Sequence, residues 1–150
     1  MRIGHIELGK HPLFLAPMED VTDQPFRLIC KELGVDVLVT EFTSVEALIR
    51  NVKKAKQRIH VLDDERPVGI QIFGTNEDSF TKAMEIVAGH KPDFIDINAG
   101  CCARKHAARG EGAGLLRDLK KFERIVKRVV EASPFPVTVK TRLGWDHDSI

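Results

Sequence analysis

The chain has 150 residues, of which 43% are hydrophobic and 30% are charged, which is the composition of a soluble globular domain. Its 23 basic and 22 acidic side chains nearly cancel, and this excludes a protein that binds nucleic acid through its overall charge. No apolar run approaches the roughly 20 residues that span a bilayer, and residues 1–5 lack the pattern of a secretory signal. We therefore expect a cytoplasmic protein with no membrane partner.

The three cysteines are an odd number without the spacing of a disulfide framework. Cys101 and Cys102 are neighbours and could be bridged only with strain, so reduced thiols in a reducing compartment are expected. Cys30 lies on the apolar stripe of a predicted helix, where a free cysteine acts as a small buried hydrophobic residue. His106 and His147 do not make the paired spacing of a structural zinc site, and we predict no metal site.

Short apolar runs separated by helical patterns predict an alternation of strands and helices along the whole chain. The predicted strands are residues 13–16, 35–39, 68–73, 94–97 and 137–139. Between them, apolar residues recur at helical spacing over residues 26–33, 45–52, 80–87 and 122–130. Each apolar stripe is expected to be one buried face.

Polar residues near these helices indicate where they begin. Thr22 or Asp23 is a possible cap of the first helix, and Thr75 and Asp78 have the spacing of a capping box before the third. The basic run 50–58 is interpreted as the exposed face of the second helix.

Strands joined by crossover helices must run parallel, so the fold class is α/β. An open doubly wound sheet and the first part of an eight-stranded barrel both fit this order. The barrel is favoured because polar residues stand near the carboxyl ends of several strands, where barrels carry their active sites: Thr40 and Glu41, Gln71, Asn98, and Lys140. No glycine-rich phosphate loop follows the first strand, as an open sheet would favour.

We predict the N-terminal portion of a parallel (β/α)8 TIM-type barrel, with about five strands and four helices. A complete barrel needs roughly 250 residues, so this chain is expected to hold little more than half of one.

The most unusual segment is residues 96–106, which run from the fourth predicted strand into a loop with the sequence DINAGCCARKH. A thiol directly after a strand end is placed to face a bound ligand. Unlike Cys30, Cys101 and Cys102 stand among polar and basic neighbours, so they are not expected to be inert core residues.

Seven segments resemble the tRNA-dihydrouridine synthase family, in the order in which that family has them. They read APM (16–18), VTDQPFR (21–27), VTE (39–41), QIFG (71–74), DINAGC (96–101), GAGLL (112–116) and VKTRLGW (139–145). The family folds as a flavin-binding barrel followed by a small helical domain. The resemblance implies that residues 1–150 are a partial FMN-binding TIM barrel, and that the last barrel strands and the helical tRNA-binding domain have no counterpart here.

The resemblance also implies which residues bind the cofactor. Pro17 and Met18 would lie against the flavin ring, and Gln71 and Lys140 would make polar contacts to it. A lysine can offset the negative charge that a reduced flavin carries near N1. The alternatives are an amide that fills the barrel interior, a lysine that extends into solvent, and a methionine that packs in the core.

Cys101 aligns with the family's catalytic cysteine, the proton donor in the reduction of a uracil ring. Thiols are mostly protonated at neutral pH, so a cysteine can act as a general acid. Asn98 would help to orient the uracil. The family usually has proline after this cysteine and the chain has Cys102, which restores an N–H and leaves the loop less rigid.

Basic residues near these positions are candidates for contacts with RNA phosphates. Arg104, Lys105, His106 and Arg109 follow the two thiols, and Arg142 follows Lys140 just after the last predicted strand. The alternative for the four residues after the thiols is a solvated loop.

The predicted function is the flavin-dependent reduction of uridine to 5,6-dihydrouridine in tRNA, with FMN as cofactor and NADPH or NADH as reductant. The expected partner is tRNA and not DNA, and the sequence leaves the oligomeric state open. One alternative is another FMN barrel oxidoreductase that acts on a free pyrimidine or an enone. The other is a non-catalytic partial barrel that binds RNA or another partner.

Overall fold

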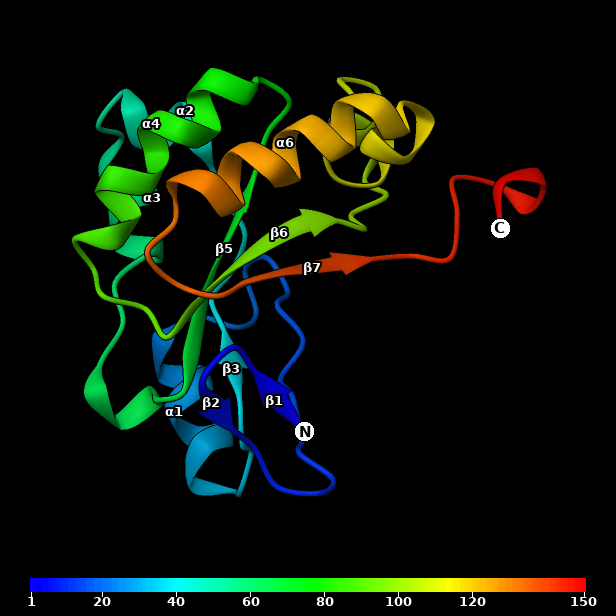
Figure 1. Cartoon of the computed structure of the whole chain (residues 1–150). Coiled ribbons are helices and arrows are strands. Elements are labelled where there is room, and N and C mark those ends of the chain that lie inside the picture. Colours follow the sequence, from blue (N-terminus) through cyan, green and yellow to red (C-terminus); the bar gives the residue numbers. More distant parts are fainter.

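The computed structural model describes residues 1–150 and is built around a curled sheet of parallel strands (Figure 1). The strands are β3 (Leu38–Val39), β4 (Thr43–Ser44), β5 (Val68–Phe73), β6 (Phe94–Ala99) and β7 (Val137–Thr141). Their order is β3-β5-β6-β7, and β4 pairs with β5 beyond the end of β3. This half-barrel confirms the expected α/β class and the N-terminal part of a TIM-type barrel.

The first predicted strand is present only as a short extended segment. Phe14 forms a parallel bridge with Val37, and the amide of Leu15 donates to the carbonyl of Val37 at 3.0 Å. The segment therefore lies beside β3, where the first barrel strand is expected, although its pairing is too short for a named strand.

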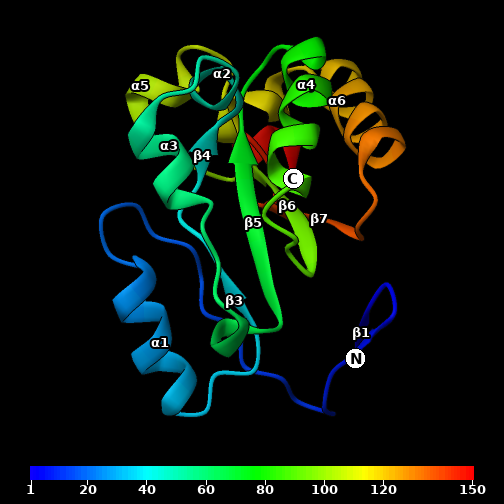
Figure 2. The same cartoon turned by 90° about the vertical axis from the view of Figure 1, so that its left-hand side faces the viewer.

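Helices cover the outer face of the sheet. They are α1 (Gln24–Glu32), α2 (Val45–Ile49), α3 (Lys53–Arg58), α4 (Glu77–Ala88), α5 (Arg104–Ala107) and α6 (Leu119–Ala132), with short 3₁₀ helices at Asp63–Glu65, Gly112–Arg117 and His147–Ser149. Helix α4 packs between α2 and α6 on one side of the sheet (Figures 1 and 2). The main core lies in this layer, and its largest buried side chains include Phe80, Ile72 and Ile97. None of the helices is long and apolar enough to cross a membrane.

Helix α1 does not bury its apolar stripe, which corrects the prediction that every stripe is a buried face. Phe26, Ile29 and Leu33 are 39%, 56% and 81% exposed, and Cys30 on the same stripe is half-buried. Arg27 instead is 2% exposed, because its Nε atom pairs with Glu65 at 2.6 Å. The interior side of α1 is therefore held by a buried charge pair.

The predicted second helix is two helices. Helix α2 ends at Ile49, and Asn51 has a left-handed φ of 58°, which breaks the helical path before α3 begins at Lys53. The basic run 50–58 is thus not one face of one helix, as predicted. It spans a turn and a separate short helix, and this changes where each basic side chain points.

The structure settles the helix caps and adds a hairpin that the sequence analysis did not predict. Asp23 caps α1 by accepting from the amide of Phe26, and Asn76 caps α4 in place of the predicted capping box of Thr75 and Asp78. An antiparallel hairpin of β1 (Arg2–Ile3) and β2 (Ile6–Glu7) precedes the barrel segment.

Candidate active site

A buried polar network joins three neighbouring strands below their carboxyl ends. Asp96 of β6 is 5% exposed, and its two carboxylate oxygens accept hydrogen bonds from Gln71 Nε2 and Thr138 Oγ1, each at 2.6 Å. Burial raises the pKa of Asp96 above its ordinary value, although these two hydrogen bonds oppose the shift. The sequence analysis did not single out Asp96, although an acid between two isoleucines of a strand was a usable signal.

The network continues from Gln71 to the loop that carries Cys101. Since Gln71 Nε2 donates to the carboxylate, Gln71 Oε1 is left to accept from Asn98 Nδ2 at 3.0 Å. Asn98 Oδ1 then accepts from the amides of Gly100 at 3.2 Å and Cys101 at 3.0 Å. A continuous chain of hydrogen bonds therefore sets the backbone of Cys101.

A close approach by Gly112 holds the Cys101 loop from the other side. The amide of Ala113 donates to the carbonyl of Cys101 at 2.9 Å. Gly112 has a φ of 56°, and a Cβ atom there would lie 2.7 Å from that carbonyl oxygen. Only glycine combines this backbone angle with this contact.

Cys101 lines a pocket of about 320 Å³ at the carboxyl ends of β6 and β7. The lining residues come from the loop after Phe14, from the segment between β3 and β4, and from β6, β7 and the segment after β6: Pro17, Met18, Glu19, Phe42, Asn98, Gly100, Cys101 and Lys140. A second cavity of about 340 Å³ shares Pro17 and Lys140 and is mainly apolar. The structure thus brings together five of the predicted site residues.

The other predicted site residues lie away from this pocket. Gln71 is fully buried beneath it and contacts it only through Asn98. Arg104 and Lys105 are exposed on α5, and Arg142 is exposed after β7. Cys102 is exposed and does not line the pocket.

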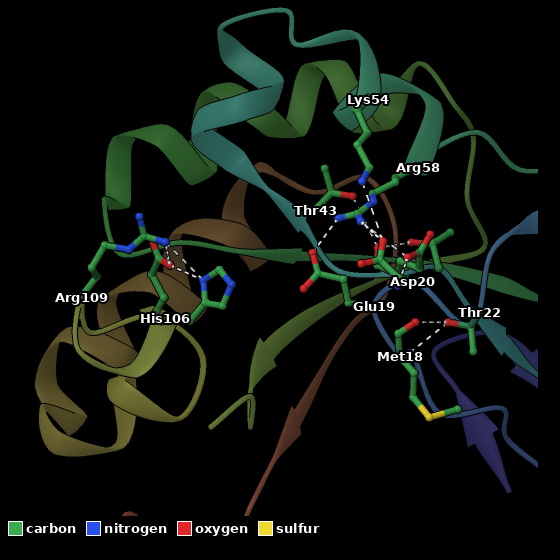
Figure 3. A network of polar contacts seen from close by, with 12 residues as sticks. Met18, Glu19, Asp20, Thr22, Thr43, Lys54, Arg58, His106 and Arg109 are labelled. Atoms are coloured by element: carbon green, nitrogen blue, oxygen red, sulfur yellow. Dashed lines mark hydrogen bonds and ion pairs between the residues drawn. The ribbon is translucent and has the colours of Figure 1, made fainter. Parts of the chain in front are cut away.

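Thr22 fixes the loop that carries Pro17 and Met18. Its buried hydroxyl accepts from the amide of Met18 at 2.9 Å and donates to the carbonyl of the same residue at 3.1 Å (Figure 3). Asp20, whose φ is 58°, donates its amide to Glu41 Oε1 at 2.6 Å. The loop is therefore tied at two points before α1 begins.

Arg58 of α3 ties the same loop from outside. Its guanidinium lies 3.1 Å from Glu19, 3.1 Å from Asp20 and 3.7 Å from Glu41 (Figure 3). Sequence reasoning missed this clamp, because its partners are 17 to 39 residues apart and carry no local pattern.

Helix α5 supports the wall of the pocket through His106. The His106 ring meets Phe42 and Phe73 edge to face, with centroids 5.6 Å and 4.9 Å away. His106 Nδ1 lies 2.7 Å from Glu111 Oε2, and Arg109 lies 3.2 Å from the same oxygen (Figure 3). Because Phe42 lines the pocket, this cluster holds one wall in place.

The arrangement of thiol, amide and lysine at the carboxyl ends of a half-barrel can be compared with known proteins. A family model described as "Dihydrouridine synthase (Dus)" matches residues 14–150. The chain belongs to the dihydrouridine synthase family.

Relatives named "tRNA-dihydrouridine synthase B" agree with this assignment. The protein of Xanthomonas axonopodis pv. citri is 38% identical over 148 residues, which are 99% of this chain and 44% of that protein. The protein of Pseudomonas putida is 40% identical over 147 residues, which are 97% of this chain and 43% of that protein. The chain spans less than half the length of these curated relatives.

Proposed function

We propose that this chain is part of an FMN-dependent enzyme that reduces uridine to 5,6-dihydrouridine in tRNA, with NADPH or NADH as the reductant. The observation that carries the proposal is the pocket in which Cys101, Asn98 and Lys140 converge. Family membership and the names of the relatives support the reaction and the RNA substrate.

The residues around the two cavities fit a flavin. The larger cavity has apolar walls that include Ala16, Pro17 and Val139, which suit a flat aromatic ring, and Lys140 lies at its junction with the Cys101 pocket. Bound FMN would supply hydride to C6 of the uracil. Lys140 would offset negative charge on the reduced ring, and Pro17 and Met18 would hold the ring in place. The polar contact expected from Gln71 stays a prediction, since its side chain already binds Asp96 and Asn98.

In this proposal the thiol of Cys101 donates the proton that C5 of the uracil requires. Asn98 lines the same pocket, where its Oδ1 atom accepts from the Cys101 amide and its Nδ2 atom donates to Gln71 Oε1. The exposed positions of Arg104, Lys105 and Arg142 are compatible with contacts to RNA phosphates around the pocket.

The test uses a longer chain that contains the remaining strands of the barrel, loaded with FMN. Cys101→Ala should let the nicotinamide cofactor reduce the flavin normally. Oxidation of that flavin by tRNA lacking dihydrouridine should slow by about 10²- to 10⁴-fold in a single turnover, the usual contribution of a general acid. Cys102→Ala is the matched control and should stay close to the unmodified protein, because its thiol lies outside the pocket.

Three outcomes would contradict the proposal. If Cys102→Ala were the more damaging change, the proton donor would have to be reassigned. If free pyrimidines or enones oxidised the flavin and tRNA did not, the substrate would be wrong. Absence of FMN from a folded sample would favour a binding protein without catalysis.

A further inference from the structure

An open groove of about 570 Å³ lies between the start of α1 and helix α3. All of its lining residues are polar and none is acidic: Gln24, Asn51, Lys53, Lys56, Gln57 and His60. The groove exists because the helix breaks at Asn51, which gives α3 a direction of its own.

Lys53 and Lys56 are the free cations of this groove. Neighbouring basic residues are already paired: Arg50 with Glu46 at 3.7 Å, Lys54 with Asp20 at 3.8 Å, and Arg58 with Glu19 at 3.1 Å. Lys53 and Lys56 form neither an ion pair nor a side-chain hydrogen bond. They are three residues apart on one helix, so they project on the same face.

The other groove residues add hydrogen-bond donors. Gln24 Nε2 lies 3.2 Å from His60 Nδ1, and when it donates there the neutral ring keeps its proton on Nε2 as a free donor. The pKa of the neighbouring His90 is lowered, mainly by burial and further by nearby positive charge, including that of Lys56. Glu65, whose Oε2 atom accepts from Gln24 Nε2 at 3.5 Å, is buried and paired with Arg27.

The groove borders the loop that forms the Cys101 pocket. Gln24 follows directly after the segment of Thr22 and Asp23, and α3 also carries Arg58, which holds Glu19 at the pocket (Figure 3). The groove and the pocket are therefore connected through the segment from Pro17 to Gln24 and through α3.

We propose that this groove is a phosphate-binding subsite for the backbone of the RNA substrate, with Lys53 and Lys56 as its cations. The inference rests on the proposed function for the identity of the RNA. The absence of any apolar lining residue favours phosphates over a protein partner, since stable protein interfaces have an apolar centre. Phosphate contacts position a nucleic acid without reading its sequence, so the subsite sets the register of the RNA and not the choice of base.

The experiment measures binding of the chain to labelled, unmodified tRNA over a series of salt concentrations. Lys53→Gln/Lys56→Gln should reduce the slope of log K against log salt by about 1.4–1.8, because each of the two lost phosphate contacts removes about 0.7–0.9. Affinity at physiological salt should fall about tenfold or more, by the same relation. The charge-matched control is Lys82→Gln/Lys120→Gln, which changes two exposed lysines, one on α4 and one in the first turn of α6, and should leave slope and affinity unchanged.

Four results would overturn the inference. The first three are no tRNA binding by the unmodified chain, an unchanged salt slope in the groove variant, and an equal loss of slope and affinity in the control variant. The fourth is binding of polyglutamate as strong as that of RNA, with the same dependence on Lys53 and Lys56. The two proposals fail separately. If tRNA binding depended on the groove but the longer chain did not reduce uridine, only the proposed function would be contradicted. If the longer chain reduced uridine but the groove variant bound tRNA as before, only the phosphate subsite would be contradicted.

Discussion

Replacing Arg27 by methionine should destabilise the fold strongly, because the change leaves a carboxylate buried without its cation. Arg27 and Glu65 are 2% and 0% exposed and lie 2.6 Å apart. Arg27 also donates to the carbonyl of Thr22 at 2.9 Å, and Glu65 accepts from the amide of Leu62 at 2.7 Å. The pair thus joins α1, the Thr22 loop and the 3₁₀ helix at Asp63–Glu65.

The size of the effect follows from what each change leaves behind. Removing one partner of a buried ion pair costs about 3–5 kcal/mol, against a typical domain stability of about 5–15 kcal/mol. Glu65→Leu should have a similar effect, because it leaves the guanidinium unpaired. The double variant Arg27→Met/Glu65→Leu buries no charge and leaves only two backbone groups without partners, at about 1–3 kcal/mol each. Each single variant leaves one of these backbone groups unpaired in addition to a buried charge, so the double variant should be no less stable than either.

Urea denaturation followed by far-ultraviolet circular dichroism measures these free energies of unfolding. As a control for association, the urea transition should be the same at different protein concentrations. The coupling energy from the double-mutant cycle should be about 3 kcal/mol or more. Single losses below about 1 kcal/mol, or a double loss equal to the sum of the singles, would refute the reasoning.

Two further predictions concern the residues around Cys101. Burial raises the pKa of Asp96 in the folded state, so stability falls as pH rises from the ordinary aspartate pKa of about 3.9 through the raised value. Asp96→Asn should flatten this slope in denaturation measured across acidic to neutral pH, and an unchanged slope would count against the assignment. Gly112→Ala should destabilise the chain by about 1–3 kcal/mol more than Gly110→Ala, since both positions have positive φ but only Gly112 meets the carbonyl of Cys101. Equal losses in thermal unfolding would show that this contact does not matter.

The sheet could be predicted where strands are long and apolar. Val68–Phe73 is β5 as expected, and β6 extends the expected strand only from Ile97 to Ala99. The hairpin of β1 and β2 could not be predicted, because each strand has two residues and no alternation to detect. The first predicted strand is not a regular strand, because its only bridge joins Phe14 to Val37, the residue before β3.

Helix α1 shows why an apolar stripe is an incomplete guide. The stripe predicts which face seeks an apolar partner, but it does not say which elements lie beside the helix. The side that faces the rest of this chain meets Glu65, which lies 38 residues away, so Arg27 is buried while Leu33 is exposed. No local sequence pattern could have predicted that the arginine is buried and the leucine is exposed.

The candidate site could be predicted where its residues stand at the carboxyl ends of parallel strands, because those ends meet at one edge of the sheet. Asn98, Cys101 and Lys140 follow from the carboxyl ends of two neighbouring strands, and they do line one pocket. The positions of Glu41 and Arg58 could not be predicted, because they depend on how a loop and a short helix pack across the chain. Whether the pocket residues act as proposed stays a prediction.

Because the chain turns at Asn51, the separate helix α3 connects the groove with the loop at the Cys101 pocket. One side of this six-residue helix carries Arg58, which pairs with Glu19 in the loop at the Cys101 pocket. The other side carries Lys53 and Lys56, which line the groove. If RNA shifts α3 when it binds, Arg58 must move with it or release Glu19. Binding of RNA in the groove and the position of the Glu19 loop at the pocket are then coupled, and the coupling free energy is the same whichever of the two changes first.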